Sequence, residues 1–569
     1  MELEERPFLE DSGQEHATRL KRWGQDVSAT HPSPAFRLGG RRRRPWTTSI
    51  PRFLGSPVEA AKRALQKESA NGYRPVSGGM TRHPGRIRSD SSWARAVCCL
   101  LTFVVTTAGV LVGAILLYGG VPRSYADIRE YERALPQHMW WLDPRAAREH
   151  PDNELTEMEG FIRFPNHLYG LGLNNVLEEM LVTSHIAHLA RRSYVFEDYV
   201  WSKLPIPFTI YDFTLRPSRI PLNAFIGGFV AGESGSFDGN TSHYRSVSSE
   251  YYDYVCPASL SSKDRVVLDA RMRPRDFRDT NALIKWWVGK INSRGAGRRC
   301  VEIREGDISK PLAKRVVHWD FFMSPVHIRS LVPELLASPV LKTWKWSPLV
   351  LRRVHQLLHD LDLVDPSASA SGSELTNGCA ATQTIPNLLA IHLRRGDYKR
   401  HCSRLLGWGS GFMGFNLAQE LPSQDAFLPP NLTDSAVPLE KYYMKRCLPD
   451  IRQVVERAQE VRRDWEESIA LPGYSSSGAS LTKVLILSNG WPDFLNELGD
   501  ALASDGWDMV NQRKGGLAQR GDRDIGVAVD MALAERAEVF LGNGFSTLSG
   551  NIALFRLSKG LSGLRNRLL

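Results

Sequence analysis

The chain has 569 residues, of which 42% are hydrophobic, and it carries a formal net charge of +10. This length and composition exclude a short module and a wholly disordered chain, because there is enough apolar sequence for one or two folded domains. Residues 1–95 contain 18 Lys and Arg against 10 Asp and Glu, so they supply +8 of the charge. The rest of the chain is nearly neutral, and we expect no nucleic-acid partner for the folded part.

Two segments precede the folded part. Residues 1–95 are rich in Arg, Ser, Gly and Pro, and we expect a disordered cytosolic tail, although Arg41–Arg44 also resembles a nuclear-localisation or nucleic-acid patch. Residues 96–118 (AVCCLLTFVVTTAGVLVGAILLY) contain no charge. At about 1.5 Å per residue they can cross a hydrocarbon core of about 30 Å. Arginines lie just before this segment, so the positive-inside rule predicts a single-pass anchor with a cytosolic N-terminus.

The chain beyond the predicted anchor would then lie in an oxidising lumen. Its cysteines are Cys256, Cys300, Cys379, Cys402 and Cys447, and we expect disulfides among them. Their number is odd, and the sequence does not give the pairing. Residues 119–158 are mixed in charge and interrupted by proline, and we expect them to form a stem.

The N-terminal half of the folded part, which we assign to residues 159–364, opens with a βαβ pattern. Phe161–Phe164 and Ser193–Glu197 are short apolar runs typical of strands, and Asn174–Arg192 has helical periodicity. A strand, a glycine-containing loop, a helix and a second strand predict a Rossmann-like unit. Residues 365–384 are of low complexity, and we expect a surface loop there.

The C-terminal half, which we assign to residues 385–569, repeats this type of pattern. Leu388–Leu393 is almost wholly apolar, which is typical of a strand buried on both faces of a parallel sheet. Lys483–Leu487 and Val539–Leu541 predict two further buried strands, and a charged amphipathic pattern over Leu439–Trp465 predicts one long helix.

The central strand is followed by charged residues, at the position where open α/β sheets bind ligands. Arg394 or Arg395 there can bind phosphate oxygens in a bidentate manner, and Gly396 permits close approach of the backbone. Taken alone, these residues are equally typical of an ordinary strand that ends in solvated charges. His392 could equally be a core histidine whose hydrogen bonds are satisfied, and Asp397 could equally be a turn residue.

Three stretches, in this order, resemble the GDP-fucose protein O-fucosyltransferase family, within the fucosyltransferase superfamily that carries an HxRR-type motif. They are Gly172–Asn175 (GLNN), His392–Asp397 (HLRRGD), and Asp530 followed by AEVFLGNGFSTLSGNIALFR. The resemblance implies an α/β fold of GT-B type, with two Rossmann-like halves facing a cleft, preceded here by a single transmembrane helix. It also implies inverting, metal-independent transfer of fucose from GDP-fucose to a hydroxyl.

The resemblance assigns roles to individual residues. Arg394 is expected to contact the β-phosphate and stabilise the leaving GDP, because negative charge builds up on the pyrophosphate in the transition state. Asp530 is expected to accept hydrogen bonds from the guanine base, and Ser546 and Thr547 to bind the phosphate where a loop enters a helix. The other expected donor-binding residues are His392, Asp397, Asn174 and Asn175.

Each of these residues also has a structural interpretation. Ser546 and Asn174 are equally typical of helix caps, and Asp530 of a solvated helix surface. The first motif departs from the family, because Val176 stands where the family often has Gln. Glu178 is close to this motif, but the spacing of Glu178 and its neighbour Glu179 indicates the helix surface, so the general base stays unassigned.

Together these patterns predict a fucosyltransferase anchored in the Golgi or endoplasmic reticulum membrane, with a lumenal catalytic part. We expect no cofactor besides the donor substrate, and a protein or glycan as acceptor. No metal site is expected, because the DxD-like pairs at 360–362 and 522–524 lie at a helix end and in a charged turn. One alternative is a catalytically inactive, membrane-bound lectin-like or nucleotide-sugar-binding protein on the same fold. Another is adhesion through the RGD tripeptides at 395–397 and 520–522.

Overall fold

The computed structural model describes residues 91–117, 121–138, 160–165, 172–204, 206–211, 214–233, 246–274, 279–305, 316–317, 322, 325–363, 384–396, 398–427, 438–470, 480–510, 524–561 and 563–569. The expectations for the tail up to residue 90, for most of the low-complexity loop, for Cys379 and for Asp397 lie outside these residues.

The first described element is α3 (Ser91–Leu117), a helix of 27 residues. Its window Ala96–Ala114 has a mean hydropathy of 2.3, and none of this window is buried. A helix of this length extends about 40 Å, at about 1.5 Å per residue. By length and composition α3 can cross a membrane, and it begins inside the segment that we expected to be tail.

Residues 121–138 pack against the folded part, so the prediction of a free stem is wrong over this range. Val121 and Tyr125 are buried at 8% and 6% exposure. The helix α4 (Ala126–Arg133) is held by an ion pair of 2.6 Å between Arg129 and Asp198. The mixed charge that suggested a stem is partly buried, because Arg129 and Glu132 form an ion pair of 2.7 Å at 11% and 1% side-chain exposure.

The first large sheet has five parallel strands in the order β8-β2-β1-β10-β9. The helix α7 (Leu173–Leu189) connects β1 to β2, which confirms the predicted βαβ unit. The strands are β1 (Phe161–Arg163), β2 (Ser193–Phe196), β8 (Val247–Ser248), β9 (Arg265–Asp269) and β10 (Cys300–Arg304).

The second large sheet also has five parallel strands, in the order β14-β13-β12-β15-β16. The predicted central strand is β12 (Ile385–Leu393), and it pairs on one side with β13 and on the other with β15. Successive connections therefore run outward in opposite directions from β12, which creates a topological switch point between β12 and β15. The other strands are β13 (Lys483–Ser488), β14 (Asp508–Met509), β15 (Ala537–Gly542) and β16 (Asn566–Leu568).

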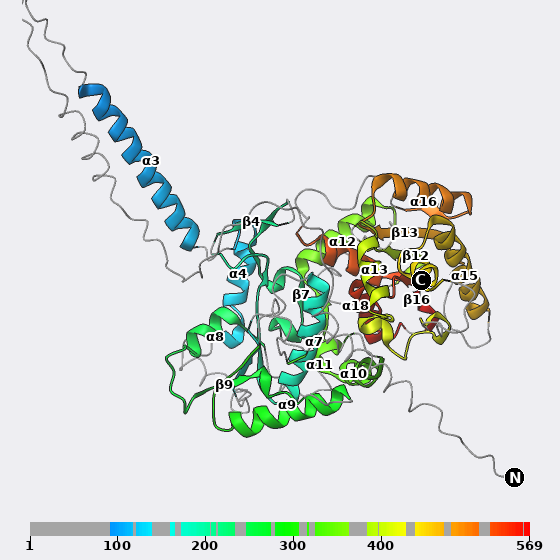
Figure 1. Cartoon of the computed structure of the whole chain (residues 1–569), viewed down its shortest axis with the longest axis horizontal. Helices are drawn as coiled ribbons and strands as arrows, with labels where there is room; N and C mark the ends of the chain where they lie inside the picture. The colour runs from blue at the N-terminus through cyan, green and yellow to red at the C-terminus, as the bar shows by residue number, and fades with distance from the viewer. Residues whose placement is uncertain are drawn as a thin grey trace, which may run out of the picture. The chain divides into compact units, whose positions relative to one another are not determined.

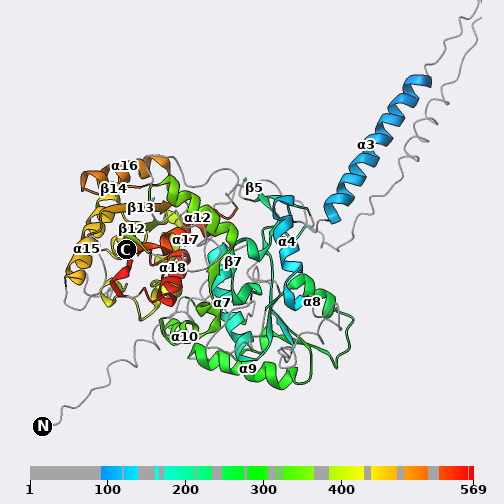
Figure 2. The ribbon, with the colours of Figure 1, turned by 180° about the vertical axis from the view of Figure 1, so that it is seen from behind.

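Alternate side chains of β12 face two different helical layers. Figures 1 and 2 show helices on both sides of this strand. Leu389, Ile391 and Leu393 pack in a cluster with α15 and α16. Leu388 and Ala390 belong to another cluster, which contains α17 and α18. The four helices are α15 (Ile451–Ile469), α16 (Pro492–Ser504), α17 (Gly526–Glu535) and α18 (Thr547–Ser558).

The cluster on the α17 and α18 side, which we call the shared core, contains residues of both sheets. Ile162 of β1 and Leu388 of β12 both belong to it and are fully buried. The helix α12 (Pro348–Asp360) contributes Val354 to the same cluster and packs against α17. The two sheets are therefore parts of one compact unit with a continuous core.

The predicted long helix over 439–465 is wrong, because the chain forms two helices there. These are α14 (Leu439–Cys447) and α15, separated at Pro449. Proline has no backbone N–H and disfavours helical conformation in the preceding residue. Asp450 then starts α15 with a capping box, in which its side chain accepts from the backbone N–H of Gln453 at 2.9 Å.

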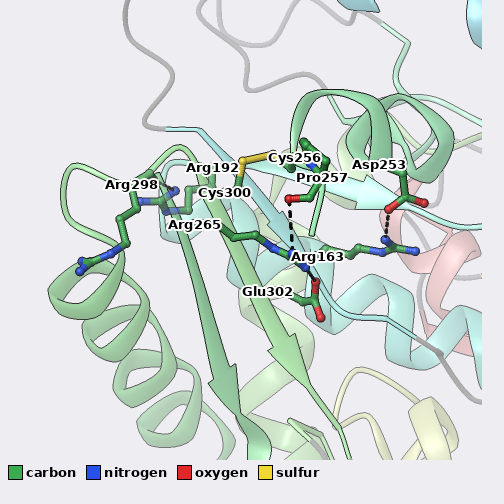
Figure 3. Close-up of a disulfide and its surroundings, with 9 residues drawn as sticks. All are labelled: Arg163, Arg192, Asp253, Cys256, Pro257, Arg265, Arg298, Cys300 and Glu302. Carbon is green, nitrogen blue, oxygen red and sulfur yellow. Dashed lines mark hydrogen bonds and ion pairs between the residues drawn. A yellow bond between two sulfur atoms is a disulfide. The ribbon is translucent and has the colours of Figure 1, made fainter. Parts of the chain in front are cut away.

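Each sheet region contains one disulfide. Cys256–Cys300 joins the end of α8 to β10, and Figure 3 shows it beside the ion pairs of that region. Cys402–Cys447 joins α13 to α14. Among the described cysteines, Cys98 and Cys99 in α3 are free.

The remaining elements are shorter or cover the sheets. Three two-stranded antiparallel sheets pair β3 with β6, β4 with β5 and β7 with β11. Their bounds, with those of the other helices, are β3 (Tyr199–Val200), β4 (Phe208–Tyr211), β5 (Thr214–Pro217), β6 (Arg219–Ile220), β7 (Ile226–Gly227), β11 (Lys345–Trp346), α8 (Ser249–Val255), α9 (Thr280–Gly295), α10 (Pro325–Ala337), α11 (Pro339–Lys342) and α13 (Tyr398–Gly407). The short 3₁₀ turns are η1 (Arg123–Tyr125), η3 (Leu222–Ala224), η4 (Phe229–Ala231), η5 (Ala270–Met272), η9 (Gly414–Leu417), η10 (Ser423–Asp425) and η11 (Gly563–Arg565).

Candidate active site

The residues after β12 keep the alternation of the strand. His392 lies on the α18 side, where its Nδ1 is 2.8 Å from Ser549 Oγ. Arg395 lies on the opposite side, where it donates to the carbonyl of Pro449 at 2.8 Å and stacks 3.8 Å from the ring centroid of Phe494. Because successive residues of an extended segment point to opposite sides, Arg394 shares the side of His392. Arg395 therefore points away from Arg394.

His392 holds the first turn of α18 in place. Its ring is buried, and burial together with the nearby Arg394 lowers the pKa of His392 to about 3, so the ring is neutral. The backbone N–H of Asn543 donates to Ser549 Oγ at 2.9 Å, which leaves the Ser549 hydroxyl to donate to His392. His392 is therefore a buried residue with a specific polar partner, and its Nδ1 is occupied by Ser549. It ties the end of β12 to α18.

The loop between β15 and α18 is fixed by close packing and by one amide. A Cβ on Gly544 would lie 2.4 Å from the Phe412 ring, so only glycine fits there. Asn416 donates through Nδ2 to the carbonyls of Gly544 and Ser546, at 3.1 and 2.9 Å. These contacts orient the start of α18 toward the end of β12.

Ser546 is the N-cap residue of α18, but its side chain makes no capping hydrogen bond. The interpretation of Ser546 as the N-cap is confirmed by its position, but its hydroxyl does not cap the helix. Thr547 is the first residue of this 12-residue helix, and it is partly exposed. The first-turn N–H groups of a helix and a hydroxyl that does not cap it are the groups that bind phosphate oxygens.

Tyr398 connects Arg394 with this helix start. The guanidinium of Arg394 lies 5.6 Å from the centroid of the Tyr398 ring. The Tyr398 hydroxyl donates to the carbonyl of Phe545, the residue before Ser546. The structure thus brings Arg394 and Ser546 to one end of the sheet, beyond β12 and β15.

Gly396 permits the turn after Arg395. Its φ is +41°, in the left-handed region that favours glycine, and a Cβ would lie 3.1 Å from the Asn489 carbonyl oxygen. The side chain of Asn489 accepts from the Arg395 N–H at 2.9 Å, which fixes the backbone at this point. The expected donor contact of Asp397 falls on a residue outside the described ones.

Asp530 lies in α17, which packs against α18. Burial raises the pKa of its carboxyl to about 7, and within the described part of the chain no hydrogen bond or ion pair compensates for the lost hydration. Asp530 is partly exposed on α17, and its surroundings nevertheless desolvate the carboxyl. No contact between the described residues joins Asp530 to Arg394, so its part in the site stays a prediction.

Asn174 and Asn175 lie in the first turn of α7, which packs against α18. Asn551 of α18 donates through Nδ2 to the backbone oxygen of Asn174 at 3.0 Å and to its Oδ1 at 3.1 Å. The N-cap of α7 is Gly172, so the interpretation of Asn174 as the cap is wrong. Asn174 joins the two halves, and Asn175 is partly exposed beside it.

Glu178 is a buried carboxyl that sequence reasoning placed on the helix surface, and that placement is wrong. It lies one turn after Asn174 on the same side of α7 and is 1% exposed. Its Oε1 has no hydrogen-bond partner among the described residues, and it would be 2.1 Å from a Cβ on Gly414. Burial raises the pKa of Glu178 well above its ordinary value. Glu179 is equally buried.

The arginine near the end of the third motif is structural. Arg556 is fully buried and donates to the carbonyl of Ala537 at 2.7 Å and to Oδ1 of Asn566 at 2.7 Å. It therefore joins α18 to β15 and to β16. Among the described residues, no three His, Cys, Asp or Glu side chains form a group that could hold a metal ion.

Comparison with known proteins gives structural neighbours only. No protein-family model matches the chain, and no curated protein matches it. The chain is similar to POFUT1 in complex with GDP-fucose, at 13% identity and a TM-score of 0.39, over 72% of this chain and 97% of that one. It is similar to apo POFUT1 at 13% identity and a TM-score of 0.40, over 72% of this chain and 98% of that one. It is similar to NodZ alpha-1,6-fucosyltransferase soaked with GDP-fucose, at 10% identity and a TM-score of 0.30, over 70% of this chain and 92% of that one. These values are too low to assign a function to this chain.

Proposed function

We propose that this protein is a fucosyltransferase of GT-B type that transfers fucose from GDP-fucose to a hydroxyl group of a protein or glycan. The observation that carries the proposal is the switch point between β12 and β15. There Arg394 and the start of α18 lie at one end of a parallel sheet, linked through Tyr398 and the His392–Ser549 pair. This is the position at which open α/β sheets bind ligands, and both groups suit a diphosphate.

The reaction breaks the bond between C1 of fucose and the β-phosphate oxygen, and GDP leaves with the electron pair. The acceptor oxygen forms its bond to C1 from the opposite side, which inverts the configuration, and its O–H bond breaks as the proton passes to solvent or to the leaving diphosphate. Arg394 would stabilise the charge that accumulates on the leaving diphosphate, and the hydroxyls and N–H groups at Ser546 and Thr547 would bind its oxygens. The chemistry needs no metal if these groups neutralise the diphosphate, and we propose a metal-independent reaction.

Asp530 would recognise the guanine base. A carboxylate can accept from the N1–H and N2–H₂ groups of guanine together. The observation in favour is that Asp530 is desolvated without a compensating partner in the described part of the chain. Two hydrogen bonds from a base would supply that compensation.

The proposed setting is the Golgi or endoplasmic reticulum membrane, with α3 as a type II anchor and the sheets in the lumen. The apolar window of α3 and the arginines before it support this orientation. The two disulfides in the folded part suit an oxidising compartment. Protease added to sealed microsomes should digest the N-terminal tail and leave the remainder intact, and protection of the tail would contradict the orientation.

The test of the function is GDP release by the full chain in detergent, with GDP-fucose compared against GDP-mannose and UDP-galactose, and with several protein and glycan acceptors. We expect release from GDP-fucose that depends on an acceptor. Release from another donor only would overturn the donor assignment. Binding of GDP-fucose without turnover on any acceptor would favour the lectin-like alternative.

A further inference from the structure

The hairpin formed by β4 and β5 exposes its apolar side chains. Ile210 is 76% exposed, Leu215 is 65% exposed and Phe208 is 46% exposed. Leu204 and Ile206, in the segment that leads into β4, are 60% and 46% exposed. Single exposed apolar residues are ordinary, but a contiguous group of this kind marks a contact surface.

The register of the hairpin shows that its apolar face is exposed and its polar face is turned toward the protein. Ile210 is paired with Leu215, and Thr209 is paired with Arg216. Directly opposed residues of an antiparallel pair share a face, and adjacent residues alternate. The face with Ile210 and Leu215 is therefore apolar and exposed. Thr209 and Arg216 are less exposed, and Arg216 stacks 4.5 Å from the ring centroid of Trp201. A hairpin that only packs on its own protein would have the opposite arrangement.

The position of the hairpin in the fold is close to the predicted anchor. Three residues, 118–120, separate α3 from Val121, the first buried residue after it. Four Cα steps of about 3.8 Å allow at most about 15 Å between Leu117 and Val121. Val121 therefore lies within about 15 Å of the end of α3 at Leu117. The surface that surrounds Val121, which includes α4, is close to the end of the predicted anchor.

The hairpin belongs to the same surface region. Arg129 of α4 forms its ion pair with Asp198, and β3 starts at the next residue. From β3 the chain enters the hairpin, whose base closes where the Ser218 N–H donates to the Pro207 carbonyl at 2.9 Å. Figures 1 and 2 both show β4 and β5 beside α4.

We propose that the β4–β5 hairpin is a second membrane-contact element, which inserts Phe208, Ile210 and Leu215 into the interfacial region of the bilayer that holds α3. Insertion buries the apolar face that the fold leaves exposed, and it leaves Arg216 on the opposite face, stacked on the protein. The hairpin and α3 then hold the folded part against the membrane at two points and restrict its orientation. The proposal rests on α3 as an anchor and does not depend on fucosyl transfer.

The test places a photo-crosslinking amino acid at position 210 of the full chain, reconstituted in nanodiscs of phosphatidylcholine. Matched controls carry it at Tyr254 and at Trp491, which are 69% and 72% exposed on other elements. We expect lipid adducts at 210 and at 215 several-fold above both controls. Equal lipid labelling at all positions would overturn the proposal, and so would adducts at 210 to a second copy of the chain or to another protein.

A second variant separates insertion from simple proximity. Ile210→Asp combined with Leu215→Asp should abolish the lipid adduct of a crosslinker at position 208, because two carboxylates oppose entry into the interface. GDP release by this variant with a soluble acceptor should match that of the parent chain, because the hairpin is not part of the catalytic site. An unchanged adduct would contradict insertion. A chain that does not incorporate into nanodiscs would overturn the premise that α3 is an anchor, whatever the outcome of the GDP-release test.

Discussion

The two five-stranded sheets are built alike around their first strand but differ in the charge that follows it. In the N-terminal sheet, β1 ends at Arg163, which is bound by Glu197 at 3.0 Å. It is also bound by Asp253 at 2.6 Å, as Figure 3 shows. In the C-terminal sheet, Arg394 follows β12 and lies over the Tyr398 ring. The first arginine is neutralised by carboxylates, whereas the second lies at the start of a helix that offers N–H groups and hydroxyls.

The alternation of each strand explains this difference. Ile162 of β1 faces the shared core, so the next residue, Arg163, points to the outer side, where α8 supplies Asp253. In β12, Ala390 faces the shared core and His392 binds Ser549 on that side, so Arg394 also points there. Equivalent topology thus produces an arginine bound by carboxylates in one sheet and, in the other, the arginine that we propose to bind the diphosphate.

The largest expected effect follows from replacing the two arginines in parallel. Arg394→Lys keeps the charge but loses the bidentate fork, and we expect kcat to fall by roughly 10²–10³, as for other groups that stabilise transition-state charge. Arg163→Lys should change kcat by less than about twofold, because its partners are structural carboxylates. Steady-state GDP-release kinetics check both. Similar losses in the two variants would break the distinction between the sheets.

The disulfides offer a second parallel comparison, since each sheet region has one. Removing either pair, by C256S/C300S or by C402S/C447S, should lower the free energy of unfolding by about 2–4 kcal/mol. Only C402S/C447S should also weaken GDP binding, because the Cys447 carbonyl accepts from Asn543 Nδ2 at 2.9 Å at the head of α18. Thermal unfolding and calorimetric titration with GDP measure the two effects. Weaker GDP binding in C256S/C300S alone would contradict the assignment of the site to the second sheet.

Sequence patterns predicted the buried strands and the residues at their ends, because apolar runs followed by Gly and Arg are local signals. The central strand follows from its apolar run, and the location of Arg394 relative to Arg395 follows from period-two alternation, whereas no pattern predicted the helix α13 after the strand. The stem and Glu178 were misjudged for a different reason. Whether a charged segment packs on a distant surface depends on tertiary contacts, such as Arg129 with Asp198, that no local pattern contains.

The pH dependence of GDP affinity tests Asp530. Its pKa is raised to about 7 by burial, and guanine needs the ionised form as acceptor. Affinity should therefore be constant above pH 7 and fall up to tenfold per pH unit below it, because the protein must lose a proton to bind. Asp530→Asn should remove this part of the pH dependence and should weaken binding at pH 8. Calorimetric titrations at several pH values measure it, and identical profiles for the variant and the parent chain would return Asp530 to a structural role.

The smallest expected effect concerns two buried glutamates, Glu178 and Glu302, whose pKa values are shifted in opposite directions. The folded-state pKa of Glu178 is raised by burial, so its contribution to stability is present at low pH and is lost as the pH rises. Burial alone would also raise the pKa of Glu302, but hydrogen bonds from Arg304 and Arg265 lower it, so its contribution is present at neutral pH and is lost on acidification. At pH 8, Glu178→Gln should raise the free energy of unfolding, because the amide removes the cost of ionising a buried carboxyl. Glu302→Gln should lower it.

Denaturant unfolding at pH 8, pH 5 and pH 3 checks both signs. The difference for Glu178→Gln should shrink at pH 5, whereas the difference for Glu302→Gln should persist at pH 5 and shrink at pH 3. A stabilised Glu302→Gln or a destabilised Glu178→Gln at pH 8 would show that the carboxyl environments are assigned wrongly.

The most direct test of the central claim is an experimental structure of the full chain with GDP. The diphosphate should lie beyond β12 and β15, within hydrogen-bond distance of the Arg394 guanidinium and of the first-turn N–H groups of α18 at Ser546 and Thr547. Arg395 should keep its contact with the Pro449 carbonyl. GDP bound at the end of the N-terminal sheet, or with Arg394 turned away from the diphosphate, would contradict the account.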